Sequence, residues 1–407
     1  MKKLLCLLMV LVISLFFIQI RHVNCLTGIT VTEVPFAAFE GDQDFYEVSD
    51  NEVIWIGNGT AGVGVYVYNI TTQTTEMLGN SGTEYISSIS NVSAAWVSRN
   101  NSTQTDEILY CPREDEYQEK IRDTAQRTEV CDLEVNSTEY SDKVFTLEKF
   151  PYQGITMNII YCWDSVLHNS IIISDADSSK IGLTIHNNYV FWSDDRNGDY
   201  DIWAYDFNSG LSFSFVSATG DQILVPCQGF ENNIGNNFIV WQDGRNCTEQ
   251  DPDNYDIYGK NLVNGQVFLI SDSLKNEVEP VAYGDDVAWI EKDIILDQNN
   301  VQIGWQDSIK KKDLITGITS TLSSTQTWKE SLCMNADFIV WSETSHLDKI
   351  NSTWNLKGYC NQLSQEFVVS NNVGDQFVLS ISGNKVFWED SRSDESDLYY
   401  AAITVEQ

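Results

Sequence analysis

The sequence predicts an all-β protein folded as a single β-propeller, because one strand pattern recurs along almost the whole chain. Eight short apolar segments, seven of which end in Trp, have ends that lie 41 to 52 residues apart. Such a spacing is typical of a four-stranded propeller blade, whose repeats run about 40 to 50 residues. The segments are 53–55, 94–96, 144–146, 190–192, 238–241, 287–289, 338–341 and 386–388.

The fifth unit illustrates the strand order that we expect in each blade. Residues 222–227 are predicted as its inner strand, 238–241 as the second, 255–260 as the third and 266–271 as the outer strand. Continuous apolar runs are expected where a sheet is covered on both faces. Asn-Gly and Ser-Gly pairs supply the tight turns before the outer strands. The charged insert 113–129 interrupts this pattern, and it is expected to form a short helix or a flexible loop.

The two ends of the chain predict how the ring closes. The last unit offers strands at 375–382, 386–388 and 397–405 and then stops without an outer strand. Residues 28–34 read as a strand with no unit of its own, so we expect them to complete the last blade and remove its exposed edge. The count is eight blades. Seven is the alternative if the third segment, which lacks Trp, belongs to an insertion.

Residues 1–25 are predicted to be a secretory signal peptide. Lys2 and Lys3 precede the apolar run 4–18, which is the build of such a leader. An uncleaved anchor is the alternative, because residues 21–25 lack a small-residue cleavage pattern. No later stretch has the roughly 20 consecutive apolar residues of a membrane helix. We therefore expect a propeller domain of residues 26–407, secreted or at the cell surface, with no membrane span after cleavage.

The charge balance of the chain argues against nucleic acid as a partner. Loss of the leader would remove three basic residues and no acidic one, taking the net charge from -35 to -38. Such a field repels phosphate backbones and favours cations or basic proteins. The expected partner is an extracellular protein or glycan, or a second copy of the chain.

Cysteines and glycosylation sequons fit a secretory route. Seven cysteines lie beyond the leader, and in an oxidising compartment up to three bridges are expected. Cys333 with Cys360 is the first candidate pair and Cys227 with Cys247 the second, because each pair lies in one repeat; Cys111, Cys131 and Cys162 compete for one further bond. Sequons begin at Asn58, Asn69, Asn91, Asn100, Asn101, Asn136, Asn246 and Asn351.

Three units share a polar motif, an acid two residues after the Trp, an Arg four residues after it, and a later Asp before an aromatic strand. This motif resembles the TolB-type β-propeller repeat, which implies a propeller scaffold and no single activity. Its residues are Trp192, Asp194, Arg196 and Asp201, then Trp241, Asp243, Arg245 and Asp256, and finally Trp388, Asp390, Arg392 and Asp397.

Two interpretations of these acidic turns remain open. In the structural one, each Arg pairs with both flanking carboxylates and ties the second strand to the third. In the other, the turns bind calcium, which takes 6 to 8 oxygen ligands. The weak calcium candidates are Asp194, Asp195, Asp199 and Asp201, and Asp243, Asp251, Asp253 and Asp256. We assign no metal and no other cofactor.

Signatures of catalysis are largely missing from the sequence. It contains no G-x-S-x-G elbow, H-E-x-x-H pair, P-loop or dinucleotide fingerprint, and we assign no catalytic residue. The main expectation is a non-catalytic binding or assembly module at or outside the cell surface. The alternative is a secreted carbohydrate-active hydrolase or lyase with carboxylates in the propeller funnel, since acid pairs for such chemistry depend on spatial separation.

Overall fold

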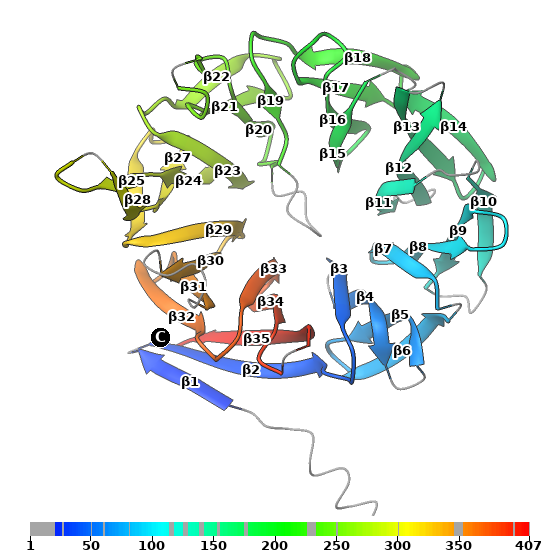
Figure 1. The fold of residues 1–407 in the computed structure, drawn as a ribbon, viewed down its shortest axis with the longest axis horizontal. Coiled ribbons are helices and arrows are strands. Elements are labelled where there is room, and N and C mark those ends of the chain that lie inside the picture. Colours follow the sequence, from blue (N-terminus) through cyan, green and yellow to red (C-terminus); the bar gives the residue numbers. More distant parts are fainter. Residues whose placement is uncertain are drawn as a thin grey trace, which may run out of the picture.

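The computed structural model describes residues 21–406, apart from positions 27, 50, 60, 61, 81, 114–117, 125–128, 138–141, 153–154, 175–177, 226–232, 250, 300, 346–352 and 394. Its strands form eight antiparallel blades arranged in a ring, as Figure 1 shows. Both the predicted all-β propeller and the count of eight are confirmed, and the alternative of seven is excluded. In the part of the chain that the structure describes, no helix is long and apolar enough to cross a membrane.

Within each blade the strands follow one another outwards from the ring centre. Blade one is β3 (Gln43–Ser49), β4 (Glu52–Gly59), β5 (Gly62–Asn69) and β6 (Thr74–Gly79); blade two is β7 (Glu84–Ile89), β8 (Ser93–Asn100), β9 (Thr105–Pro112) and β10 (Glu119–Asp123). Blade three is β11 (Glu129–Ser137), β12 (Asp142–Tyr152), β13 (Ile155–Asp164) and β14 (Asn169–Ser174); blade four is β15 (Lys180–His186), β16 (Tyr189–Asp194), β17 (Asp201–Asp206) and β18 (Leu211–Val216).

The second half of the ring repeats this order with one addition. Blade five is β19 (Gln222–Ile223), β20 (Phe238–Asp243), β21 (Asp256–Asn261) and β22 (Val267–Ser271); blade six is β23 (Asn276–Tyr283), β24 (Asp286–Lys292), β27 (Ser308–Asp313) and β28 (Thr319–Ser324). Between β24 and β27 stands a separate hairpin of β25 (Ile294–Leu296) and β26 (Gln302–Trp305). Blade seven is β29 (Thr327–Met334), β30 (Phe338–Ser345), β31 (Trp354–Cys360) and β32 (Gln365–Ser370).

The N-terminal strand closes the ring, as predicted. Blade eight is β33 (Gln376–Ser382), β34 (Lys385–Asp390) and β35 (Asp397–Val405), and β2 (Ile29–Ala37) pairs antiparallel with β35 as its outer strand (Figure 1). β1 (Arg21–Leu26) adds a fifth strand beside β2. The predicted signal boundary at residue 25 therefore falls inside β1 and leaves β2 whole.

The charged insert 113–129, which follows the third strand of blade two, does not form the helix or loop that we expected. β10 lies within it and pairs with β9, so the insert supplies the outer strand of its blade. The prediction was wrong because the edge of a sheet can accept a charged strand: β10 packs against one neighbour, and most of its side chains stay partly exposed.

The hydrophobic core lies between neighbouring blades. One apolar cluster joins blades three and four through Phe145 and Val190, and another joins blades seven and eight through Val340 and Val386. The repeated Trp of the second strand, present in seven of the eight blades, is fully buried in these layers; the set is Trp55, Trp96, Trp192, Trp241, Trp289, Trp341 and Trp388. Removing such a side chain typically costs about 3 to 5 kcal/mol, which explains why the Trp recurs.

The inner strands carry bulges where they pass the central channel. The register shifts between Val278 and Val281 on β23 and between Glu330 and Cys333 on β29. Glu279 and Ser331 lie in these bulges with φ of 52° and 58°, in the left-handed region that non-glycine residues rarely adopt. Bulges of this kind turn side chains out of the sheet and are frequent beside functional sites.

Candidate functional site

The repeat motif forms a compact polar unit inside each of three blades. In blade four the Trp192 indole Nε1–H donates to Asp194 Oδ2 over 2.9 Å. Arg196 donates from Nε to Asp194 Oδ1 over 3.0 Å and from Nη2 to Oδ2 over 2.6 Å, and its guanidinium lies 3.8 Å from the centre of the Trp203 ring. Asp194 thus accepts three hydrogen bonds from the side chains of Trp192 and Arg196, and Arg196 also stacks on an aromatic ring.

Blades five and eight repeat this unit with small changes. Asp243 accepts from Trp241 and Arg245, and Arg245 stacks on Tyr258 at 3.8 Å. Asp390 accepts from Trp388 and Arg392, whose guanidinium lies 4.1 Å from the Tyr399 ring centre.

In blade four, burial raises the pKa of Asp194, but hydrogen bonds from Arg196 and Trp192 outweigh the effect of burial, so the pKa of Asp194 falls below its usual value.

The predicted pairing of each Arg with both flanking carboxylates holds only for the first of the two. The later aspartates Asp201, Asp256 and Asp397 do not take the Arg as a hydrogen-bond donor. Each accepts a 2.6 Å hydrogen bond from the residue that follows the Arg, which is Asn197, Asn246 and Ser393 respectively. In each unit the Arg directs Nε and Nη2 to the first acid and stacks its face on the aromatic ring, and in blade eight the remaining Nη1 of Arg392 reaches Glu33 of β2 and not Asp397.

In blade seven a lysine takes the place of the Arg beside the acidic residue. Trp341 Nε1 donates to Glu343 over 3.1 Å, and the fully buried Lys329 of β29 lies 3.7 Å from the same carboxylate. The sequence pattern missed this lysine because it comes from the inner strand, 14 residues before the acid.

The calcium candidates do not converge on a cation site. Asp194 and Asp243 are occupied by Arg, Asp195 accepts the Ser179 N–H at 2.7 Å, and Asp199 accepts the Gly220 N–H at 2.8 Å. Asp251 and Asp253 are exposed on their turn. Within the described ranges, no group of three or more His, Cys, Asp or Glu is placed to hold a metal ion.

The predicted disulfide between Cys333 and Cys360 is contradicted by the topology. Cys333 lies on β29 and Cys360 on β31, with β30 between them. Two strand spacings amount to about 9 to 10 Å, whereas a disulfide requires Cα atoms within about 7 Å. Cys111 packs between blades one and two and Cys162 between blades three and four, so these two are not joined either. Cys227 and the side chain of Cys131 lie outside the described residues.

The described sequons lie on strands near turns or in turns. Asn69 begins the turn between the third and outer strands of blade one, and Asn100 begins the turn between the second and third strands of blade two. Their Oδ1 atoms accept backbone N–H groups, and the Asn246 side chain donates to Asp256. Asn91, Asn101 and Asn246 are exposed, and Asn58 is partly buried. Asn351 and the side chain of Asn136 lie outside the described residues.

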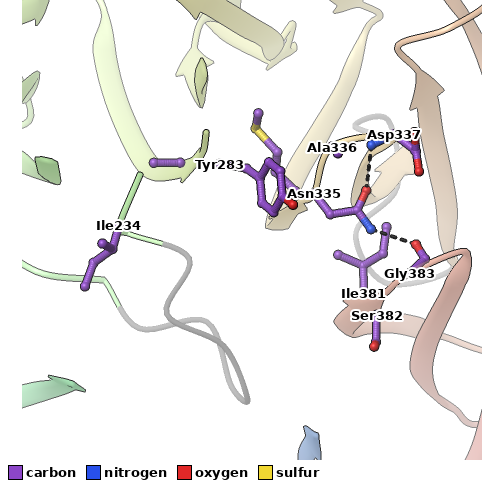
Figure 2. A pocket seen from close by; sticks show the side chains of 10 residues that line it. Ile234, Tyr283, Asn335, Ala336, Asp337, Ile381, Ser382 and Gly383 are labelled. Carbon is purple, nitrogen blue, oxygen red and sulfur yellow. Dashed lines mark hydrogen bonds between the residues drawn. The ribbon is translucent and has the colours of Figure 1, made fainter. Parts of the chain in front are cut away.

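A cavity of about 500 Å³ opens at the channel end where inner strands turn into second strands (Figure 2). Its walls are mostly small or apolar, and Tyr283 projects into it. Asn335 is committed to the wall itself, since it donates to the Gly383 carbonyl and accepts from the Asp337 N–H. Among the lining residues that the structure describes, Asp337 is the one carboxylate, so these residues offer no pair of convergent acids such as hydrolysis requires.

Two carboxylates come together elsewhere, on the channel wall between blades six and seven. Glu279 Oε2 accepts the Leu332 N–H over 3.3 Å across the blade interface. Burial raises the pKa of Glu279; Lys292 and the backbone N–H of Leu332 oppose this shift, and the nearby Glu330 charge adds to it. A raised pKa favours the protonated carboxyl, which can then act as a proton donor.

Aromatic rings and a lysine surround this pair. Glu330 Oε2 accepts the Trp328 indole N–H over 3.1 Å, and the centre of the Trp328 ring lies 4.5 Å from that of Trp305 on the blade-six hairpin. Lys292 Nζ lies 4.6 Å from the Trp328 ring and 3.2 Å from Asp307, whose side chain is fully buried. The cluster of Glu279, Glu330, Lys292, Trp305 and Trp328 is called the wall site below.

Sequence reasoning missed the wall site. Its residues belong to four strands, β23, β24, β26 and β29, and share no motif. An acid pair is recognisable only by its spatial separation. A weak signal was present in the long connection after Trp289, which makes the interval to Trp341 the longest of the seven, at 52 residues. That connection contains the hairpin that carries Trp305.

Comparisons with known proteins extend this description. No family model matches the sequence, and no curated protein matches it at a significant level. An oligogalacturonate lyase from Vibrio parahaemolyticus has a similar structure, with a TM-score of 0.53 and 10% identity over 95% of this chain and 97% of its own. An oligogalacturonate lyase in complex with manganese gives 0.52 and 10% over 96% of both chains. A structure from a study of two prolyl endopeptidases gives 0.54 and 8% over 87% of this chain and 55% of its own.

At such low identity the likeness shows the fold alone, and the fold predicted from the TolB-type repeat is confirmed. The expectation of a non-catalytic module is nevertheless corrected. The similar structures with TM-scores of 0.5 or more include lyase, hydrolase and endopeptidase chains, and the lyase aligns from end to end. That expectation rested on missing enzyme motifs, and a fold that hosts many activities gives the absence of those motifs little weight against catalysis. One similar structure contains manganese, but no cofactor is shown for this chain.

Proposed function

We propose that this protein is a secreted carbohydrate-active enzyme that hydrolyses glycosidic bonds at the wall site. The observation that supports the proposal best is the juxtaposition of Glu279 and Glu330. Burial raises the pKa of the first, and the second accepts an indole N–H, so the two carboxyls lie in unlike environments. Glycoside hydrolysis requires such a pair, one carboxyl protonated and the other ionised.

The roles follow from the two environments. Protonated Glu279 donates its proton to the oxygen of the leaving sugar as the bond to the anomeric carbon breaks. Ionised Glu330 either attacks that carbon or removes a proton from the attacking water, and Trp328 fixes its orientation. Lys292 is a positioning residue, because its ammonium already contacts the buried carboxylate of Asp307.

Glu279 also has a structural contact, which a test must separate from catalysis. Glu47 of blade one makes a related contact, since its Oε2 accepts the Ile89 N–H of blade two over 2.7 Å. Glu47→Gln is therefore a matched control: it changes an acid that bonds the next inner strand but lies outside the wall site.

The test is cleavage of a panel of neutral and acidic oligosaccharides by wild type, Glu279→Gln, Glu330→Gln and Glu47→Gln. We expect each wall-site variant to lose at least about 10²-fold in kcat, the lower end of what a positioned acid or base contributes. Glu47→Gln should keep the wild-type rate. The wild-type rate should also fall as pH rises through the elevated pKa of Glu279, because the proton donor is then lost.

Other outcomes would contradict the proposal. Absence of cleavage across the panel, or equal rates for wild type and Glu279→Gln, would remove hydrolysis at the wall site. Products with a new carbon–carbon double bond, detected by their ultraviolet absorbance, would identify a lyase instead.

The cellular context of the proposal comes from the sequence. The leader at residues 1–25 and the sequons support export, and the partner is a glycan outside the cell. Manganese or another metal is not required by the two-carboxylate scheme.

A further inference from the structure

One face of the propeller carries two aromatic pairs on successive blades. All four residues stand at or near the start of a third or an inner strand, the end of the blade where the second strand finishes. Trp305 and Trp328 form a pair between blades six and seven, with ring centres 4.5 Å apart. Trp354 and Phe377 form a pair between blades seven and eight, 5.2 Å apart. Figure 1 shows that β25, the hairpin partner of β26, is followed around this part of the ring by β29, β31 and β33.

These rings differ from the tryptophans of the core. Each of the four is partly exposed, whereas the seven repeated Trp residues of the second strands are fully buried. Large aromatic side chains on a surface are enriched at binding sites, because they offer contact area at a small entropic cost. Trp305 reaches its position through the hairpin β25–β26, which blade six adds to the repeat.

Polar groups accompany both pairs. Glu330 bonds the Trp328 indole, and Asp375 accepts the Trp354 backbone N–H over 3.0 Å. A carboxylate at the edge of Trp328 and another at the backbone of Trp354 place hydrogen-bond acceptors near the aromatic rings. This combination suits a ligand with an apolar face and a rim of hydroxyl groups, which describes a pyranose. The net charge of -35 repels a polyanionic chain and leaves a neutral one unaffected.

We infer that Trp305–Trp328 and Trp354–Phe377 are consecutive binding subsites for a neutral oligosaccharide that runs across blades six to eight. The inference rests on the proposed function for the class of ligand. To the proposed function it adds the two aromatic subsites, a path for the oligosaccharide that leads away from the wall site, and a preference for uncharged sugars.

The experiment measures binding separately from cleavage. Cellohexaose, chitohexaose, maltohexaose and hexagalacturonic acid are titrated by calorimetry into the full chain carrying Glu279→Gln, and then into the same chain with Trp305→Ala or Trp354→Ala added. We expect at least one neutral hexasaccharide to bind, with each Trp→Ala change raising Kd about tenfold or more, which corresponds to about 1.4 kcal/mol. Hexagalacturonic acid should bind more weakly than that sugar.

Two controls keep the result interpretable. Trp305→Phe retains a ring and should restore most of the affinity. The unfolding midpoint of the Trp305→Ala variant itself shows whether that variant is folded. Tyr283→Ala removes a partly exposed ring at the cavity near the other channel end and should leave Kd unchanged.

The outcomes separate this inference from the proposed function. Binding that depends on the two Trp residues, without cleavage by the wild type, supports the subsites and removes the hydrolase. Cleavage with Kd unchanged in both Trp→Ala variants overturns the subsites and leaves the hydrolase. No saturable binding of any neutral probe, or a preference for hexagalacturonic acid, also overturns the inference.

Discussion

Replacing Arg392 by alanine should destabilise the ring more than replacing Arg245, although both belong to the same repeat motif. Arg392 bonds Asp390, whose side chain is fully buried, and also Glu33 of the closing strand β2, whose side chain is 3% exposed. Glu33 further accepts from the Asn372 side chain at 3.0 and 3.1 Å. The substitution therefore leaves two buried carboxylates without their cation at the point where the ring closes.

The magnitude follows from burial. Breaking a buried ion pair by removing one partner costs about 3 to 5 kcal/mol, and we expect that loss for Arg392→Ala. Arg245 serves one carboxylate and its side chain is 26% exposed, so Arg245→Ala should cost about 1.5 to 3 kcal/mol, the range for hydrogen bonds to charged groups. Lys149→Ala, at an exposed position, should stay within about 0.5 kcal/mol of wild type.

The assay is urea unfolding followed by tryptophan fluorescence, with and without saturating calcium. Both Arg variants should show the same loss in calcium and in chelator, because the Arg already occupies the carboxylate oxygens. Wild-type stability for either variant, or a wild type that gains stability from calcium while the variants do not, would refute this reasoning.

Three further predictions concern the closing strand, the thiols and acid stability. Deleting residues 1–34 should remove the cooperative unfolding transition, since β35 then loses most of its outer neighbour; an unchanged midpoint would contradict ring closure by β2. Peptide mapping without reductant should find no bridge between Cys333 and Cys360, and finding one would require blade seven to be rebuilt. Asp194 has a lowered pKa, so its contribution to stability is present above pH 3.8 and is lost as pH falls towards its folded value. Asp194→Asn should therefore show a smaller drop in urea midpoint than wild type between pH 5 and pH 3; equal drops would contradict this assignment.

The repeat itself was readable from the sequence because each blade must bury the same surfaces. The apolar run of the second strand packs against a neighbouring blade and ends in Trp in seven of its eight copies, so it recurs at nearly constant spacing and gives the count of eight. The closing strand was predictable for a related reason, since a blade without an outer strand leaves an open edge. The Asp–Arg pair within a turn could be foreseen because its partners lie two residues apart.

Contacts between residues far apart in the chain were decided by the tertiary structure. Cys333 and Cys360 share a repeat, but the intervening strand β30 separates them. Lys329 replaces the Arg of the motif from another strand, and Glu279 gains its raised pKa from burial at an interface between two blades. The sequence alone therefore determined the architecture, which depends on a periodic local pattern. The wall site depends on which inner-strand bulges lie side by side at the interface between neighbouring blades, and that is fixed only when the ring closes.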